Sequence, residues 1–299
     1  MDYTQYTTKS FNQNDIEAAQ TLISLALRED LGNHGDLTSS IAISPDQTAR
    51  VAINARQGGI VSGLPIAAMV LQAVDQSLEI EIKVKDGLPV VAGQTIAVVT
   101  GLTCQLLIAE RTVLNFMTHL AGIATLTSRF VDQVAGTSAT ILDTRKTHPG
   151  FRLLEKYAVR CGGGDNHRIG LYDAVLIKDN HLAARKISHP DEASAELLKL
   201  ARATYPGVVL EVEVDTLEQF QEMIPGQPDI VLLDNMSNVQ LKQAVEMRNR
   251  LGSGILLEAS GGVDLKTVKE IASTGVDRIS IGAITHSAPA FDFGFDWVE

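Results

Sequence analysis

The amino-acid sequence predicts an α/β protein in which an incomplete (β/α) barrel is joined to an N-terminal α+β sandwich domain. Three observations lead to this fold class. Short runs that alternate between apolar and polar residues fill the first third of the chain, and continuous apolar runs separated by helical patterns fill the rest. Alternating runs are typical of antiparallel strands, whereas apolar runs with helical crossovers indicate a parallel sheet. Most of the apolar runs also end in a polar residue.

Residues 1–115 are expected to form the N-terminal domain, and the C-terminal tail 286–299 is expected to join it. Apolar residues at helical spacing predict a helix over 14–30, with Asn14 or Asp15 as its N-cap. The other expected elements of this domain are one helix and three antiparallel strands: 64–74, 48–56, 77–84 and 94–101.

Residues 116–285 are expected to form the barrel domain, which follows a long helical segment over 103–134. Its six predicted strands are 139–143, 174–179, 208–214, 229–234, 254–260 and 277–282. The helices predicted between them are 192–204, 216–224, 238–251 and 264–274. A closed (β/α) barrel has eight strands, so the barrel is either incomplete or has a further strand within 155–172. No strand is followed by a dinucleotide-type glycine fingerprint, which favours a barrel over a Rossmann sheet.

The ends of the predicted strands indicate where the site lies. The residues at these ends are Asp143, Lys178, Glu213, Asp234, Ser260 and Gly282. In (β/α) barrels the carboxyl ends of the strands form the active-site face. A charged strand end can also simply begin a solvated loop, but the repetition favours a shared site.

The charge of the chain is unevenly distributed. Its formal net charge is −11, yet the window 141–186 contains nine Lys and Arg residues against five acids, which leaves it at +4. A local basic cluster in an acidic protein indicates a small, multiply anionic ligand and argues against nucleic acid. No apolar run is long enough to span a membrane, and Cys104 and Cys161 are too few for a disulfide framework or a zinc site. These features favour a soluble cytoplasmic protein.

Six motifs carry a resemblance to a known family. They are DTRKTHPGFRLLEKYAVRCGGGDNHR, LIKDNH, EVEV, LLDNMS, EASGGV and TGVDRISIGAITHS. In this order and spacing they resemble the quinolinate phosphoribosyltransferase family, whose fold is of the type II phosphoribosyltransferase kind. The resemblance runs from EDLGNHGDLTS at 29–39 to THS at 285–287. It implies transfer of phosphoribosyl from phosphoribosyl pyrophosphate to quinolinate with decarboxylation, giving nicotinate mononucleotide, pyrophosphate and CO₂ in NAD biosynthesis, with Mg²⁺ as cofactor.

The resemblance also implies which residues bind the two anionic substrates. The implied contacts from the basic window are Thr144, Arg145, Lys146, His167, Arg168 and Lys178. Arg suits planar, bidentate recognition of carboxylates. Arg111 is implied to enter the site of a neighbouring subunit, so a homodimer or a higher oligomer is expected. Its spacing from Asn115 and His119 predicts one shared helix face, which a merely solvated helix would also show.

The resemblance implies a catalytic set of Lys146, His167, Lys178, Glu213 and Asp234. Glu213 and Asp234 are expected near the ribose hydroxyls and near magnesium that pyrophosphate carries, without direct metal ligands from the protein. Glu211 is the alternative to Glu213, because alternation places both on one strand face. Either Lys146 or His167 could protonate the ylide that decarboxylation leaves.

Two late loops are expected to bind phosphate through their backbone. They contain Ser260, Gly261 and Gly262, and Ile281, Gly282 and Ala283. Small residues leave backbone N–H groups exposed at this end of a barrel, although tight turns explain such residues equally. The glycines 162–164 are expected to allow close backbone approach beside His167. His148 and His34 are expected to be solvated, and His181 to make a structural hydrogen bond or a ligand contact.

Two other functions are compatible with the sequence. A related type II enzyme would act on nicotinate or nicotinamide, but these substrates have at most one carboxylate and need fewer cations. A catalytically silent relative would bind pyridine carboxylates without turnover. Assays of CO₂ release and of turnover separate these alternatives.

Overall fold

The computed structural model describes residues 3–188 and 194–298. The chain folds into two compact units, each built from several segments. The first unit comprises Met1–Ser128, Lys146–Gly164 and Ile284–Glu299, and the second comprises Arg129–Arg145 and Asp165–Ala283. This division differs from the expected one at residue 115: the boundary falls after Ser128, and both positions lie within the helix α4 (Thr103–Gln133). It also assigns residues 146–164 to the first unit.

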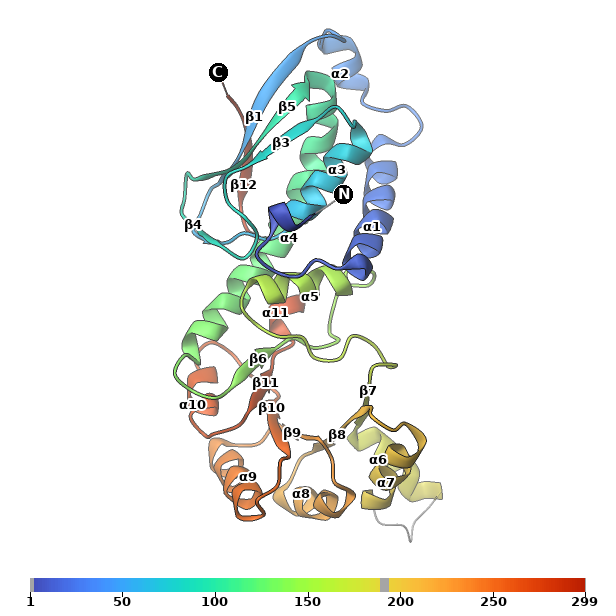
Figure 1. Cartoon of the computed structure of the whole chain (residues 1–299), viewed down its shortest axis with the longest axis vertical. Coiled ribbons are helices and arrows are strands. Elements are labelled where there is room, and N and C mark those ends of the chain that lie inside the picture. Colours follow the sequence, from blue (N-terminus) through green and yellow to red (C-terminus); the bar gives the residue numbers. More distant parts are fainter. Residues whose placement is uncertain (1–2, 189–193, 299) are drawn as a thin grey trace. The chain divides into compact units, whose positions relative to one another are not determined.

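The first unit contains an antiparallel sheet in the order β12-β1-β5-β3. Its strands are β1 (Thr48–Ala55), β3 (Glu79–Ile82), β5 (Thr95–Leu102) and β12 (Phe293–Trp297). The strand β12 lies in the C-terminal tail and pairs with β1, with Val51 opposite Trp297. The helix α3 (Leu64–Val74) lies beside this sheet (Figure 1) and its first eight residues are buried.

The helix α1 (Gln13–Leu31) begins earlier than the sequence pattern suggested. Its N-cap is Asn12, whose side-chain oxygen accepts from the amides of Asn14 and Asp15 at 2.9 and 3.1 Å. The Asp15 carboxylate in turn accepts from the Asn12 amide at 3.0 Å, which completes a capping box. The expected cap at Asn14 or Asp15 is therefore wrong, because the reciprocal pair of hydrogen bonds requires the cap three residues before Asp15.

The helix α5 (Arg152–Cys161) belongs to the first unit because its buried face bonds to that unit. The Tyr157 hydroxyl donates to the fully buried Asp86 carboxylate at 2.8 Å, and Arg160 pairs with Asp15 at 2.8 Å. A Cβ atom on Gly162 would overlap the Ala124 carbonyl oxygen of α4. The glycine at 162 therefore does allow a close backbone approach, and the partner is α4.

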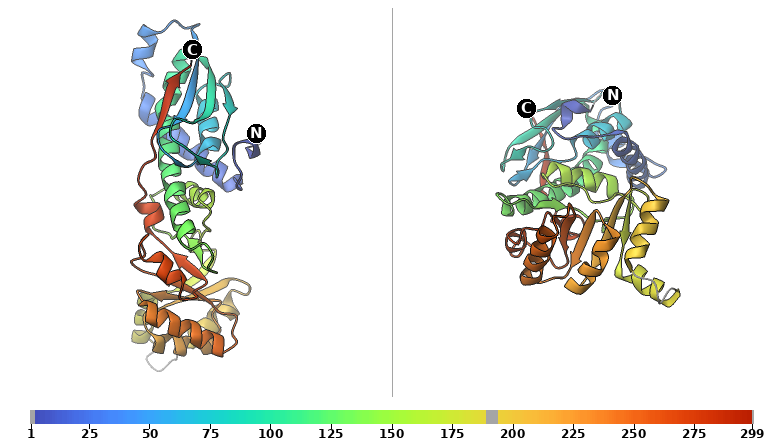
Figure 2. Two further views of the ribbon diagram at one scale, coloured as in Figure 1. Left: turned by 90° about the vertical axis from the view of Figure 1, so that its left-hand side faces the viewer. Right: turned by 60° about the horizontal axis from the view of Figure 1, so that its bottom comes forward.

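The second unit is a parallel sheet in the order β6-β11-β10-β9-β8-β7. Its strands are β6 (Thr140–Leu142), β7 (Ala174–Ile177), β8 (Val209–Val214), β9 (Ile230–Asp234), β10 (Leu256–Ser260) and β11 (Arg278–Ser280). Four helices form an arc outside the strands (Figures 1 and 2): α7 (Ser194–Thr204), α8 (Leu217–Met223), α9 (Asn238–Arg250) and α10 (Val268–Ala272). All six expected strands are present, and the α/β class is confirmed.

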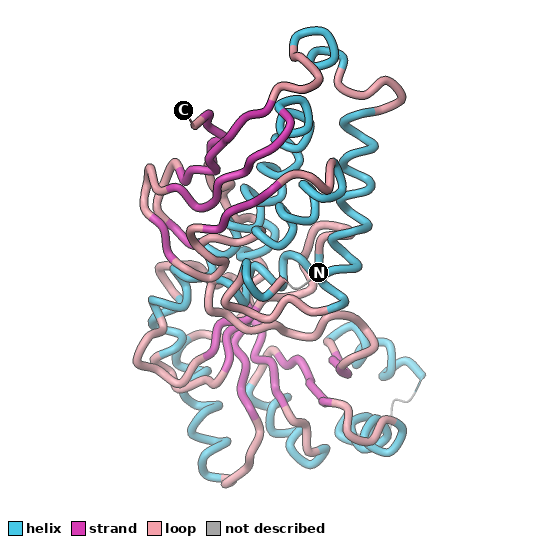
Figure 3. The backbone as a smooth tube through the Cα atoms, turned by 45° about the horizontal axis from the view of Figure 1, so that its top comes forward, coloured by secondary structure: helices cyan, strands magenta, loops and turns pink. Residues whose placement is uncertain are grey.

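The barrel is incomplete, as one of the two sequence interpretations required. Within the described residues, the outer strands β6 and β7 do not pair with each other. Figure 3 shows the strands of the chain in magenta and its helices in cyan. The alternative of a further strand within 155–172 is wrong, because this segment holds the end of α5 followed by loop. A single bridge between Leu142 and Asp165 is all that extends the sheet there.

One predicted helix is clearly shorter in the structure, and another is described only in part. The helix α10 is shorter than predicted because Asp264 starts a turn, its carboxylate accepting from the amides of Lys266 and Thr267 at 2.8 and 2.9 Å. Residues 192 and 193 of the helix predicted over 192–204 lie outside the described part of the chain. The remaining elements are η1 (Thr4–Tyr6), α2 (Leu37–Ala42), β2 (Gly59–Ile60), β4 (Pro89–Val90), α6 (Asp179–Ser188), η2 (Ile224–Gly226) and α11 (Ala283–His286). Among the described helices, none has both the length and the apolar character that crossing a membrane requires.

Candidate active site

The parallel strands of the second unit bring the expected site residues to one edge of the sheet. The residues at this edge are Thr144 and Arg145 after β6, Lys178 after β7, Glu213 in β8, Asp234 in β9, Ser260 in β10, and Ile281, Gly282 and Ala283 after β11. Since the strands are parallel, all of these positions lie toward their carboxyl ends, where barrel enzymes bind their substrates. The Ile281 amide donates to the Leu142 carbonyl at 2.9 Å, which joins β11 to β6.

Asp143 attaches the loop of residues 165–168 to the end of β6. Its carboxylate is fully buried and accepts from the His167 amide at 2.9 Å and from Asn166 Nδ2 at 2.6 Å. The Asp165 amide donates to the Ile141 carbonyl at 2.9 Å, so the backbones also meet. The DTRKT and GGGDNHR motifs therefore meet at a buried acid. Asp143 was seen in the sequence only as a polar strand end.

The imidazole of His167 is buried between carboxylates of two strands. Its Nε2 lies 3.1 Å from Glu211 Oε2 and 3.3 Å from Glu258 Oε1, and only 8% of its side chain is exposed. Burial opposes the charged form, but the hydrogen bonds to Glu211 and Glu258 outweigh it and raise the pKa of His167 to about 9. Arg278 Nε pairs with Glu258 Oε2 at 2.8 Å. Neither Glu258 nor Arg278 was expected to take part in the site.

Register explains why these charges meet on one face of the sheet. Glu213 and Glu258 are both aligned with Leu232 of β9, and Glu258 is aligned with Arg278 of β11. Aligned residues of neighbouring strands point to the same face, and so do residues two apart within one strand. Glu211 therefore shares the face as well. The glutamate two residues before Ser260 in EASGG was a signal of this in the sequence.

Arg145 and Arg168 form the cationic part of this edge. Arg168 Nη1 donates to the Ala174 carbonyl at the start of β7, at 3.2 Å. Burial lowers the pKa of Arg168, and the charge of Arg145 lowers it further. Within the described residues, the buried Arg145 Nε has no hydrogen-bond partner. A buried donor next to a second cation is a place where an anion is stabilised.

Lys178 and Glu213 form an ion pair across β7 and β8. The Lys178 side chain is 43% exposed, whereas Glu213 is almost buried. The Lys178 amide donates to His181 Nδ1 at 2.9 Å, so His181 makes a structural hydrogen bond. Of the two candidate glutamates, Glu211 contacts His167. Glu213 lies two residues further along β8, closer to the carboxyl end of the strand.

The loops after β9 and β10 are joined to each other by Asn235. The Asn235 amide donates to the Ser260 carbonyl at 2.9 Å, and its side chain donates to Asp234 Oδ2 at 2.7 Å. A Cβ atom on Gly261 would overlap Asn235 Oδ1, and Gly261 has a φ of 95°. Both constraints require glycine at this position. The Gly261 loop is thus held close to Asp234.

The first unit carries the other two expected site residues. Arg111 is 64% exposed and lies 3.9 Å from Glu110 of the same helix. The Lys146 carbonyl accepts from Thr285 Oγ1 at 2.7 Å.

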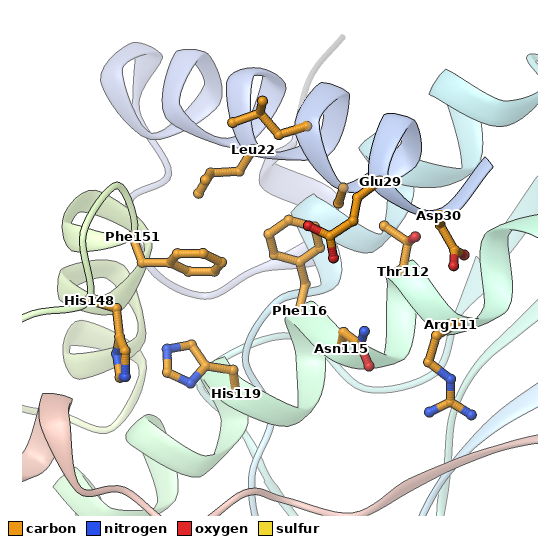
Figure 4. Close-up of a pocket in the computed structure, with 12 residues that line it drawn as sticks. Leu22, Glu29, Asp30, Arg111, Thr112, Asn115, Phe116, His119, His148 and Phe151 are labelled. Atoms are coloured by element: carbon orange, nitrogen blue, oxygen red, sulfur yellow. The ribbon is translucent and has the colours of Figure 1, made fainter. Parts of the chain in front are cut away.

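Arg111 lines a pocket of about 500 Å³ within this unit (Figure 4). The lining residues are Leu22, Leu25, Ala26, Glu29 and Asp30 of α1, Arg111, Thr112, Asn115, Phe116 and His119 of α4, and His148 and Phe151. The face predicted for Arg111, Asn115 and His119 is therefore found, and it borders a cavity.

Glu155 is buried next to this pocket and accepts from two imidazoles. His119 Nε2 lies 2.9 Å and His148 Nδ1 2.6 Å from the same Oε1 atom, and the side chain of His148 is 54% exposed. His148 was expected to be solvated; it is half-exposed but held by this bond. These contacts are shorter than the separation of about 3.3 Å between two ligands of a tetrahedral zinc ion. The geometry is therefore that of hydrogen bonds. His34 is exposed, as predicted.

Family models match almost the whole chain. The C-terminal domain of quinolinate phosphoribosyl transferase matches residues 123–296, and the N-terminal domain of the same family matches residues 36–121. The carboxylating nicotinate-nucleotide pyrophosphorylase of Mycobacterium leprae is 41% identical over 94% of this chain and 98% of its own length. A decarboxylating quinolinate phosphoribosyltransferase of Nicotiana glauca is 41% identical over 91% of this chain and 80% of its own.

Solved structures show the same likeness. The nicotinate-nucleotide pyrophosphorylase of Francisella tularensis superposes with a TM-score of 0.88 at 37% identity, covering 98% of this chain and all of that one. The corresponding protein of Ehrlichia chaffeensis gives a TM-score of 0.85 at 38% identity over 98% of this chain. The polar carboxyl edge of the incomplete barrel is consistent with these similarities in sequence and structure. The chain belongs to the quinolinate phosphoribosyltransferase family.

Proposed function

We propose that this protein transfers the phosphoribosyl group of phosphoribosyl pyrophosphate to quinolinate and releases CO₂. The products are nicotinate mononucleotide and pyrophosphate, which makes this the step from quinolinate toward NAD. Membership of the family supports the reaction class. The observation that carries the proposal for this chain is the buried Nε of Arg145, which lies beside Arg168 and has no hydrogen-bond partner in the described part of the chain, as suits an anionic substrate.

The cationic and the acidic side chains at the carboxyl edge of the parallel sheet match the charges that develop in this reaction. Arg145, Arg168 and Lys178 supply cations for the two carboxylates of quinolinate and for the donor phosphates. Glu213 and Asp234 lie on the neighbouring strands β8 and β9 and supply negative charge. The glycine loops at 260–262 and 281–283 offer backbone N–H groups to phosphate.

The chemistry needs positioning and electrostatic stabilisation more than a covalent nucleophile. The pyridine nitrogen attacks the anomeric carbon as pyrophosphate leaves, so the ribose becomes cationic, and the carboxylates of Glu213 and Asp234 stabilise it. The ribosylated ring is then cationic, and its carbon 2 can release CO₂ while the bonding electrons stay on the ring. Either Lys146 or His167 returns a proton to that carbon.

Magnesium fits the carboxylate part of this edge as a companion of pyrophosphate. Asp234 and Glu213 offer the hard oxygen donors that Mg²⁺ prefers, and magnesium commonly keeps several waters between itself and the protein. Bound there, the ion would neutralise charge on the leaving pyrophosphate. Lys178 already pairs with Glu213, so Asp234 is the residue we expect nearest to the hydrated ion.

Release of CO₂ from carboxyl-labelled quinolinate tests the function. We expect release that depends on phosphoribosyl pyrophosphate, and its loss in Arg145→Ala and Lys178→Ala with folding retained. Lys199→Ala is the matched control, because Lys199 is an exposed lysine whose ion pair is with Glu196 on its own helix. Consumption of nicotinate without CO₂ release would instead identify the related enzyme, and absence of any turnover would identify a silent relative.

The same proposal includes a homodimer in which Arg111 completes the partner's site. The exposed guanidinium of Arg111 borders a pocket and has only the nearby Glu110 as an ion-pair partner in the described chain. If Arg111 acts across the dimer, a mixture of inactive Arg111→Ala and Lys178→Ala chains regains activity. Random association makes about half of the dimers heterodimers, and each heterodimer has one intact site of its two. About a quarter of wild-type activity should therefore return. No recovery after verified subunit exchange would rule out a shared site.

We also place this reaction in the cytoplasm. The two cysteines, Cys104 and Cys161, are free thiols in the structure, which suits a reducing compartment. Localisation of a tagged full-length chain by fractionation is the direct check.

A further inference from the structure

Two buried glutamates face one ring nitrogen of His167, and the proposed reaction gives them no role. The imidazole is held at Nε2 by two glutamates from strands that are separated by β9. Glu258 is fully buried and Glu211 nearly so. Two carboxylates at one ring nitrogen are costly to bury unless that nitrogen carries a proton.

Charged groups of three strands and of the adjacent loop surround this imidazole. They are Glu211 on β8, Glu258 on β10, Arg278 on β11 and, at the adjacent residue, Arg168 with its neighbour Arg145. Asp143 of β6 holds the His167 amide. The positive charge of Arg278 balances Glu258. A proton on Nε2 makes the hydrogen bond to Glu211 and attracts the Glu258 Oε1 atom 3.3 Å away, which has no hydrogen-bond partner within the described residues. The cluster is therefore arranged to hold Nε2–H in place.

The other ring nitrogen has a different partner. His167 Nδ1 lies 2.8 Å from the Arg168 amide, which donates to it. This contact favours a neutral ring with the proton on Nε2, whereas the two carboxylates favour the imidazolium. Charge-assisted hydrogen bonds are roughly twice as strong as neutral ones, so the carboxylates outweigh one amide. Nδ1 is then the atom at which the ring gains or loses its second proton.

We propose that Glu258 is a positioning residue that, together with Glu211, fixes the proton of His167 on Nε2 and so makes Nδ1 the basic atom of this ring. The inference deepens the proposed function. A fixed Nε2–H sets the orientation of the ring, and protonation of Nδ1 competes with the Arg168 amide. Glu258 thereby acts on the two neighbouring site residues, His167 and Arg168, without touching substrate.

Histidine side-chain ¹⁵N NMR of the wild-type protein tests this without any substrate. The chain has seven histidines, so His167→Asn identifies the signal. Above the pH of titration we expect the Nε2–H tautomer. A ring protonated on Nδ1 instead would overturn the proposal even if no variant folds.

The charge of Glu258 is tested by Glu258→Gln, which keeps the shape of the side chain. We expect the proton affinity of Nδ1 to fall at least tenfold, with the same shift in the pH profile of kcat/KM. In Arg278→Gln we expect the opposite shift, because Glu258 then loses its competing cation. If Glu258 had a purely structural role, the proton affinity of Nδ1 would shift in the same direction in both variants. Glu270→Gln, an exposed glutamate on α10, is the control.

These readouts separate this inference from the proposed reaction. Unchanged titration of His167 in folded Glu258→Gln would refute the role of Glu258 whatever the protein catalyses. Absence of CO₂ release together with the expected tautomer and shift would refute only the reaction.

Discussion

Replacement of Asp143 should disrupt the site by releasing the loop of residues 165–168. The buried carboxylate accepts from the His167 amide at 2.9 Å and from Asn166 Nδ2 at 2.6 Å. Hydrogen bonds to a charged group contribute about 1.5–3 kcal/mol each, so Asp143→Ala should lower the free energy of unfolding by about 3–6 kcal/mol. Asp143→Asn keeps an acceptor for the His167 amide but turns an NH₂ group toward Asn166, so its loss should be about half as large.

The consequence for activity follows from the same contacts. His167 and Arg168 lie on the released loop, and a displacement of about 1 Å in a catalytic group can cost about 100-fold in rate. We expect kcat/KM for CO₂ release to fall by about this factor in Asp143→Ala under conditions where the variant is still folded.

Urea unfolding followed by far-UV circular dichroism measures the first effect, and labelled quinolinate measures the second. Glu222→Ala, an exposed acid on α8, is the control and should stay within about 0.5 kcal/mol of wild type. If Asp143→Ala is as stable and as active as that control, the loop is held by other contacts and the reasoning is wrong.

Three further predictions test other parts of the structure. Since the pKa of folded His167 is raised from 6.5 to about 9, its contribution of about 3 kcal/mol is fully present below pH 6.5 and is lost as the pH rises through 9. Urea titrations of wild type and His167→Asn should diverge below pH 9 and converge above it. Gly162→Ala should destabilise by about 1–3 kcal/mol because the new methyl group meets backbone, whereas Gly254→Ala, with open space around it, should be nearly neutral in thermal unfolding. Glu155→Ala should cost about 2–4 kcal/mol because it leaves two imidazoles without an acceptor, whereas the exposed Glu196→Ala should not; equal melting temperatures for these two variants would contradict the hydrogen-bonded cluster.

The secondary structure was largely predictable because it depends on neighbouring residues. Alternation within EVEV indicated a strand, and the polar residue after each apolar run marked where the strand ends. The N-cap of α1 was misplaced because Asn12 and Asp15 depart from the usual S/T-x-x-E/Q pattern of a capping box, so that only the structure shows their reciprocal hydrogen bonds. The sequence also allowed a further strand in the segment that includes the end of α5. In the structure this segment makes a single bridge to β6, at Asp165, whose amide donates to the Ile141 carbonyl.

The partners of the site residues were less predictable. His167 was named from its motif, yet its contacts, Glu211 and Glu258, lie 44 and 91 positions later in the chain. Glu258 was visible in EASGG, but only the register of β9 against β8 and β10 shows that it shares a face with Glu213. The role of Asp143 required knowing that the loop at 165–168 returns to the end of β6.

By itself, the sequence determined the class of the fold, the family and the kinds of side chain in the site, because these follow from local periodicity and from motifs that are continuous in the chain. The tertiary structure decided which charges meet. Strand register and the path of one loop place His167 between two buried glutamates and leave Arg145 Nε without a partner among the described residues. Such contacts join segments far apart in the chain, and the energy of a charge depends on distance and burial, which no local pattern encodes.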